Sequence, residues 1–252
     1  MSLPELPGLV SADQLQLTAS TIAEWQLPNG MIPWFPGGHS DPWNHIEAAM
    51  ALAVTGNLDQ AEAAYQWLID TQHQEGPGKG GWHQYYLTDG IEDPKFDANV
   101  IAYIATGVWH HWLMTGDRGF LETLWPTVEA AITFVLQLQT PIGGIKWARQ
   151  ADGTAFDYAL LTGSSSICHS LRCAVAVGEE LGHERPGWEL SLANLAHAVR
   201  TQPVGAFAPK ERWAMDWYYP VLSGAFDHAD GRAHLDRQAN KFILAGHGVR
   251  CV

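Results

Sequence analysis

Residues 53–69, "AVTGNLDQAEAAYQWLI", contain the end of one helix, a tight turn at Gly56 and the start of a second helix. Apolar residues recur at three- and four-residue spacing on both sides of the turn, which is typical of two helices that each bury one face. Gly56 fits the position after a helix end where the backbone is left-handed. The stretch therefore predicts a helix hairpin.

The same pattern returns in residues 112–139, 179–199 and 224–244, roughly every 60 residues, with turns at Gly116 and Gly182 in the first two. Long connections between the hairpins share a second signature, in which a Gln at a helix end is followed by Gly and Trp. It occurs as "EWQLPNGMIPW" (24–34), "DTQHQEGPGKGGW" (70–82) and "QLQTPIGGIKW" (137–147). Helix pairs joined alternately by short turns and long loops predict an all-α fold, an α/α toroid of the (α/α)6-barrel type.

The periodicity predicts nine helices and no strand. The helices are expected at 11–26, 42–54, 58–73, 97–114, 117–139, 164–181, 186–200, 217–226 and 230–244. We expect a single domain over residues 1–252, because no linker, charge block or low-complexity run divides them. Nine helices make about four and a half hairpins, fewer than the six of a closed (α/α)6 ring. We therefore expect an incomplete C-terminus, through truncation, closure by another subunit of a homo-oligomer, or an open ring.

The composition restricts the partners. The formal net charge is −13, and Lys and Arg are scattered singly, which argues against nucleic acid and an anionic membrane as partners. The N-terminus lacks the pattern of a signal peptide, and no segment reaches the roughly 18–20 apolar residues of a membrane span. We expect a cytoplasmic protein in which Cys168, Cys173 and Cys251 are reduced.

The long connections are the expected site, because loops usually carry function. On one rim of a toroid they would bring together aromatic rings and polar side chains. Aromatic rings cover the apolar faces of a sugar, and polar groups bind its hydroxyls, so we expect an oligosaccharide substrate. The residues expected to bind it are Trp34, His39, Trp43, Asn44, Trp82, Tyr86, Asp97, Trp147, Asp157, Glu211, Trp213 and Tyr218.

Three carboxylates are candidates for catalysis. Asp41 precedes Pro42 at a predicted helix start, so it is expected to cap that helix. The same position suits a general base, because the helix dipole and N–H donors favour an ionised carboxylate. Glu47, which shares a helix face with Trp43, and Asp216 are the other candidates; a paired or solvent-facing Glu47 is the structural alternative.

Other common site chemistries lack their motifs. His39, His45 and Asp41 could contact a metal, but no HExxH or CxxC-type spacing supports a metal site. A GxSxG elbow and a phosphate-binding Gly loop are also missing from the sequence. No metal and no cofactor are expected.

The Gln–Gly–Trp repeats resemble those of prenyltransferases and squalene-type terpene cyclases, and the loop lengths equally resemble six-hairpin glycosidases. More narrowly, "GMIPWFPGGHSDPWNHIEAAMAL" (30–52), "KFDANVIAYIATGVWHHW" (95–112) and "WYYPVLSGAF" (217–226) are similar to an actinobacterial prenyltransferase-like group that includes methylmannose polysaccharide hydrolases. The resemblance implies hydrolysis of an internal α-glycosidic bond of a mannose-type oligosaccharide by two carboxylates. By its place in the motif, Asp41 is one of them. Members of the group continue through further rim loops, so we expect the acidic partner beyond residue 252.

Three functions follow, in order of preference. The first is a glycoside hydrolase with an inverting mechanism, in which base and acid lie roughly 6.5–9.5 Å apart. The second is an isoprenoid enzyme, although the sequence lacks a DxDD motif for a cyclase and an Asp, Cys and His set for a zinc-dependent prenyltransferase. The third is a carbohydrate-binding toroid without catalysis.

Overall fold

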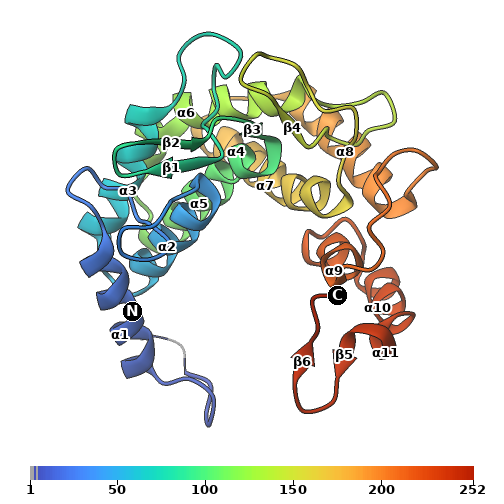
Figure 1. The fold of residues 1–252 in the computed structure, drawn as a ribbon, viewed down its shortest axis with the longest axis horizontal. Coiled ribbons are helices and arrows are strands. Elements are labelled where there is room, and N and C mark those ends of the chain that lie inside the picture. Colours follow the sequence, from blue (N-terminus) through green and yellow to red (C-terminus); the bar gives the residue numbers. More distant parts are fainter. Residues whose placement is uncertain (1–2, 4) are drawn as a thin grey trace.

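The computed structural model describes residue 3 and residues 5–252, and its helices form an arch with α1 at one end and the C-terminal strands at the other (Figure 1). The inner helices are α2 (Pro42–Val54), α4 (Ala98–Ala102), α5 (Ile104–Thr115), α7 (Leu161–Leu181) and α9 (Ala214–Leu222). The outer helices are α1 (Ala12–Trp25), α3 (Leu58–Thr71), α6 (Arg118–Leu136), α8 (Pro186–Thr201) and α10 (His228–Asp236). Along the arch α2 contacts α5, α5 contacts α7, and α7 contacts α9, while each also packs on the outer helix that follows it. The predicted α/α toroid is confirmed.

Several predicted helix boundaries need correction. The helix predicted over 97–114 is two helices, α4 and α5, which meet at Tyr103. The helix predicted over 217–226 begins earlier and ends at Leu222, where Ser223 and the left-handed Gly224 (φ +70°) follow. The last predicted helix, 230–244, is divided into α10 and the short α11 (Ala239–Phe242).

The expectation of no strand was wrong. The described residues contain the short strands β1 (Tyr85–Leu87), β2 (Gly90–Asp93), β3 (Phe96–Asp97), β4 (Ala148–Arg149), β5 (Ile243–Leu244) and β6 (Gly248–Val249). Strands β1 and β2 form an antiparallel hairpin in which Leu87 lies opposite Gly90. The two residues of the turn are Thr88 and Asp89, and Gly90 already belongs to β2 without a left-handed backbone, so the hairpin lacks the Asn-Gly or Asp-Gly turn by which such hairpins are predicted.

The long connections lie on one rim, because each is hydrogen-bonded to the next. Ser40 in the first connection exchanges two backbone hydrogen bonds of 2.8 Å with Tyr86 in the second. The second is joined to the third by the pairing of β3 with β4. In the third, the carbonyl of Ala159 accepts a bond of 2.9 Å from the amide of Ala208 in the fourth. The inner helices therefore all begin around one mouth.

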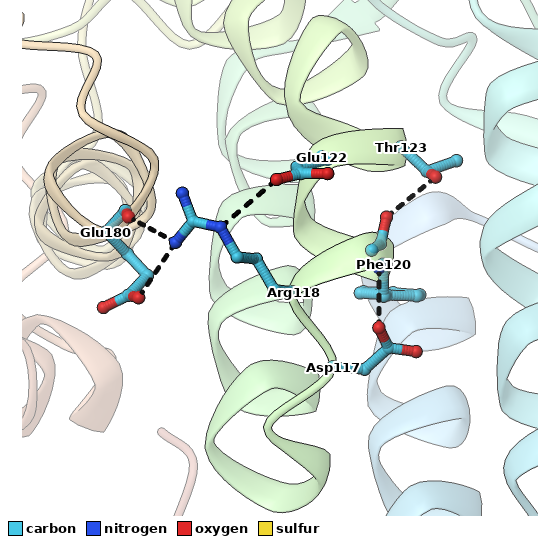
Figure 2. Close-up of polar contacts among 7 residues, drawn as sticks. Asp117, Arg118, Phe120, Glu122, Thr123 and Glu180 are labelled. Carbon is cyan, nitrogen blue, oxygen red and sulfur yellow. Dashed lines mark hydrogen bonds and ion pairs between the residues drawn. The ribbon is translucent and has the colours of Figure 1, made fainter.

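The short turns lie at the opposite end of the helices. Gly116 and Gly182 are left-handed there, with φ of +67° and +77°, as predicted. Figure 2 shows Arg118 of α6 donating to the backbone carbonyl of Glu180 at the end of α7, at 2.9 Å, and to the Glu122 carboxylate at 3.2 Å. The contact with Glu180 connects neighbouring hairpins at the face opposite the rim, whereas the contact with Glu122 lies within α6.

The Gln of each repeated signature fastens a rim loop to the next outer helix. The side-chain amide of Gln72 donates to the carbonyls of Gly80 in its own loop and Thr127 in α6, both at 2.9 Å. Gln26 and Gln139 make the equivalent pairs of bonds, to Gly30 and Gln60 and to Gly143 and Ser191. This contact gives the Gln–Gly repeat its structural cause.

We predict that Gln72→Ala lowers the free energy of unfolding by about 2 kcal/mol, because it removes two buried hydrogen bonds, to the carbonyls of Gly80 and Thr127. Urea unfolding measures the change. Gln66→Ala is the matched control, since the exposed Gln66 amide donates to Asp70 on its own helix, and it should cost less than about 0.5 kcal/mol. Equal losses for the two variants would contradict the role assigned to Gln72.

Most of the apolar core is one cluster shared by the inner and outer helices from α2 to α8. A smaller cluster of Ala214, Trp217 and Phe242 holds the C-terminal elements together. The single domain expected over residues 1–252 stays a prediction. In the part of the chain that the structure describes, none of the helices is both long enough and apolar enough to cross a membrane.

Candidate active site

Asp41 caps α2 at the rim, as predicted. Its Oδ1 accepts from the Asn44 amide N–H at 3.0 Å, and its Oδ2 accepts from Trp34 Nε1 and Asn44 Nδ2, both at 2.7 Å. The residue is only 2% exposed. All three neighbouring groups are donors, so the arrangement suits an ionised carboxylate at the start of a helix.

The side chains that cover Asp41 are themselves accessible. Trp34 is 46% exposed, and Trp34 and Asn44 line a pocket of about 310 Å³ between α1 and α2, here called the rim pocket. His39 packs edge-on against Trp34, with ring centroids 4.7 Å apart, and its Nδ1 lies 2.8 Å from Glu92 on β2. Asp41 does not line this pocket itself, but it is hydrogen-bonded to Trp34 and Asn44, which do.

His45 holds the first rim loop in place. Its Nδ1 accepts from the Ile32 amide at 3.0 Å, which fixes the proton on Nε2, and Nε2 donates to the Ala64 carbonyl at 2.8 Å. Burial lowers the pKa of His45 to about 4, so the ring is neutral near pH 7. Both nitrogens are occupied, and the role is structural. Within residue 3 and residues 5–252, no group of three or more His, Cys, Asp or Glu side chains is placed to hold a metal ion.

Glu47 lies in the second turn of α2, in a cavity of about 370 Å³ between the inner helices, here called the axial cavity. The Tyr103 hydroxyl donates a hydrogen bond to Glu47 Oε1. Trp43 lies against Tyr103 with ring centroids 4.8 Å apart, and Tyr219 of α9 also lines the cavity. Burial, together with the neighbouring Glu47, raises the pKa of Tyr103, so its hydroxyl stays protonated.

Asp216 lines neither the rim pocket nor the axial cavity. It accepts from the amide and the hydroxyl of Thr162, at 3.2 and 2.5 Å, and so caps α7 from a neighbouring helix. Burial raises the pKa of the Asp216 carboxyl. Asp216 lines a cavity of about 230 Å³ with Glu211 and His234, whereas Glu47 lines the axial cavity. The three predicted catalytic carboxylates therefore do not line one common cavity.

Asp97 and Trp147 support each other in the second and third rim loops. Asp97 caps α4 by accepting from the amides of Asn99 and Val100, at 2.9 and 3.3 Å, and the next amide, that of Ala98, donates to the Trp147 carbonyl at 2.9 Å. Burial raises the pKa of Asp97 to about 6. Lys95 lies over the Trp147 ring, 5.4 Å from its centroid. These contacts give Asp97 and Trp147 structural roles in the second and third rim loops.

Trp82 and Tyr86 were predicted to bind the sugar, and this prediction was wrong, because both rings are buried. Trp82 is completely buried, and its Nε1 donates to the Leu68 carbonyl at 2.8 Å. Tyr86 is buried against Trp67, and its hydroxyl accepts from the His83 amide at 3.0 Å. Both rings fill the space between a rim loop and an outer helix.

The remaining predicted binding residues are spread along the rim. Asp157 and Glu211 are exposed, Trp213 precedes α9 and is half-buried, and Tyr218 packs on Tyr219 with ring centroids 5.2 Å apart. Tyr103 and His169 also line the axial cavity and were not among the predicted residues. Local signals do not distinguish them, because Tyr103 lies in an apolar stretch and His169 lies within a long helix.

Solved structures share this architecture at low sequence identity. The chain superposes on a rhamnosidase from Klebsiella oxytoca with a TM-score of 0.62 and 13% identity, covering 93% of this chain and 49% of that one. An endo-β-1,4-glucanase from Acetobacter xylinum gives a TM-score of 0.64 at 15% identity, over 92% of this chain and 79% of the glucanase. A D-mannose isomerase gives 0.62 at 12% identity, over 98% and 75%. These likenesses show the fold alone, and the chain spans about half the length of the rhamnosidase.

The fold, with carboxylates on its rim, is an α/α toroid, the fold that the rhamnosidase and the glucanase also have. No protein-family model matches the chain. It is, however, 47% identical over 251 residues to the MMP endo-(1,4)-3-O-methyl-α-D-mannosidase of Mycolicibacterium hassiacum, a match that spans 100% of this chain and 68% of the relative. The chain belongs to the family of this mannosidase, a family of glycoside hydrolases, which confirms the resemblance found in the sequence.

Proposed function

We propose that this protein hydrolyses an internal α-(1,4) bond of a 3-O-methylmannose oligosaccharide, with Asp41 as the general base. The environment of Asp41 supports this assignment. Its carboxylate accepts three hydrogen bonds, from the side chains of Trp34 and Asn44 and the Asn44 amide, and the Trp34 side chain at the rim is exposed. The substrate class is supported by the family relative, which is named for this bond and sugar.

In the proposed reaction Asp41 accepts a proton from a water molecule as the water oxygen attacks the anomeric carbon. The bond from that carbon to the glycosidic oxygen breaks, and a carboxylic acid gives its proton to the leaving oxygen. An inverting outcome requires room for the water between the two groups, roughly 6.5–9.5 Å. We assign only the base, because neither the cavity lined by Asp216 nor the axial cavity lined by Glu47 is also lined by Asp41.

We also propose that the protein acts in the cytoplasm, with the oligosaccharide as its partner and without nucleic acid or membrane. The net charge of −13 disfavours polyanionic partners. Cys168 and Cys173 are buried free thiols, and Cys251 is an exposed one, which is typical of a reducing compartment.

The test is incubation with an α-(1,4)-linked 3-O-methylmannose oligosaccharide, followed by mass spectrometry of the products and NMR of the new anomeric centre. We expect shorter oligosaccharides from internal cleavage, with inverted configuration at the new reducing end. The unmethylated oligomannoside is the matched control and should be cleaved more slowly. Binding without any product would overturn hydrolysis in favour of a carbohydrate-binding toroid.

A further inference from the structure

The first two turns of α2 form walls of two separate cavities. Trp43 and Glu47 line the axial cavity, whereas Asn44 and Ala48 line the rim pocket. Consecutive residues of a helix are rotated by about 100°, so these are adjacent faces of one helix. Asp41, the cap of this helix, precedes Trp43 by two residues and Asn44 by three, so it is next to the first α2 residue that lines each cavity.

The axial cavity combines the groups that bind a sugar ring. Its volume of about 370 Å³ falls within the range of ligand pockets. The aromatic rings of Trp43 and Tyr219 can cover apolar sugar faces, and the Glu47 carboxylate can accept from hydroxyls. Leu222 contributes an apolar side chain that is 71% exposed. An exposed Leu beside a carboxylate suits a ligand that is part polar and part methylated.

We propose that the axial cavity is a sugar subsite adjacent to Asp41, in which Glu47 and Tyr103 orient a mannose ring through its free hydroxyls while its O-methyl group faces Leu222. The inference rests on the proposed function, because it takes the substrate class from there. It makes Glu47 a substrate-binding residue, and it gives the pair Glu47 and Tyr103 the task of discriminating between hydroxyl and methoxyl groups.

The chemistry of the pair sets the orientation. Tyr103 donates to Oε1 of Glu47, which leaves Oε2 able to accept from a ligand hydroxyl. A methoxyl oxygen has no proton to donate, so a methylated position turned toward Glu47 would leave the carboxylate desolvated and unpaired. A methyl group turned toward Leu222 instead buries apolar surface, which favours the methylated sugar by about fourfold.

The test measures binding by calorimetry in the Asp41→Asn background, where turnover does not remove the ligand. The probe is the α-(1,4)-linked 3-O-methylmannose oligosaccharide. We expect Glu47→Gln and Tyr103→Phe each to weaken its binding at least tenfold, and Leu222→Asn to remove the preference for it over the unmethylated oligomannoside. Glu62→Gln, a half-exposed carboxylate that lines a different pocket, is the matched control and should bind as the background does. Thermal unfolding confirms that every variant is folded.

The outcomes separate this inference from the proposed function. Unchanged binding in Glu47→Gln and Tyr103→Phe, with hydrolysis by the wild type, overturns the subsite alone. Weakened binding in both variants, with no hydrolysis by the wild type, supports the subsite and overturns the proposed reaction. A Glu47→Gln variant of the wild type that loses kcat with unchanged KM overturns the binding role, because such a split indicates a group acting only in the transition state.

Discussion

Asp41→Asn is expected to lower the rate of hydrolysis at saturating substrate by about 10³-fold, the usual contribution of a general base. The amide oxygen can still accept the cap hydrogen bond from the Asn44 backbone, so α2 should keep its start. The amide cannot take a proton from water, and its NH₂ group cannot accept from Trp34. Initial rates, calorimetric affinity and thermal unfolding on the same preparation would measure the three consequences.

Asp216→Asn is the matched control for this prediction. Asp216 also caps a helix, through Thr162, but it lines a different cavity from the axial cavity. We expect a stability loss of about 1 kcal/mol and less than a tenfold change in rate. If Asp41→Asn only lowers the melting temperature while hydrolysis continues, Asp41 is a helix cap without a catalytic role.

The helix hairpins could be predicted because their signals are local. Apolar spacing within one helix and a glycine at its end depend on residues a few positions apart, and Gly116 and Gly182 have the left-handed backbone that this pattern requires. The Gln–Gly–Trp repeat was visible, but its cause was not. The Gln72 amide reaches Thr127, which is 55 residues away, and no local pattern indicates such a partner.

In the candidate site, too, a feature set by local sequence could be predicted and a feature set by tertiary packing could not. The cap at Asp41 follows from the Asp–Pro dipeptide at a helix start. The different environments of two equivalent tryptophans could not be predicted, because Trp34 and Trp82 end the same signature. The Trp82 indole donates inward to Leu68, whereas the Trp34 indole donates to Asp41 and leaves the ring exposed. The direction of each ring is set by how its loop packs on the neighbouring loop, which is tertiary information.

Of these features, the axial cavity was the hardest to predict from the sequence. Glu47 and Tyr103 are separated by 56 residues and meet only because α2 packs against α5. The spacing of Trp43 and Glu47 placed both on one helix face, but it could not say whether that face lies against solvent or a cavity. The helices around this cavity could therefore be predicted from the periodicity. The cavity residues that come from helices other than α2, such as Tyr103, could not.

Gly80→Ala is expected to lower the free energy of unfolding by about 3–5 kcal/mol, from overpacking and a strained backbone together. Gly80 has φ +87°, and a Cβ atom there would lie 2.3 Å from the backbone oxygen of Ala130 in α6. A helix carbonyl cannot move aside as a flexible side chain can, so either the loop or α6 must shift. The shift would also disturb the Gly80 carbonyl that accepts from Gln72. Urea denaturation followed by circular dichroism would measure the loss.

Gly76→Ala in the same loop separates the two causes of this loss. Gly76 also has a left-handed backbone, with φ +72°, but a Cβ atom there would meet no heavy atom within 4 Å. Its substitution should therefore cost only the backbone strain, about 1–2 kcal/mol. The difference between the two variants measures how closely the rim loop approaches α6. Equal losses would show that Gly80 does not pack against Ala130, and the proposed fastening of the rim loops to the outer helices would then fail at this repeat.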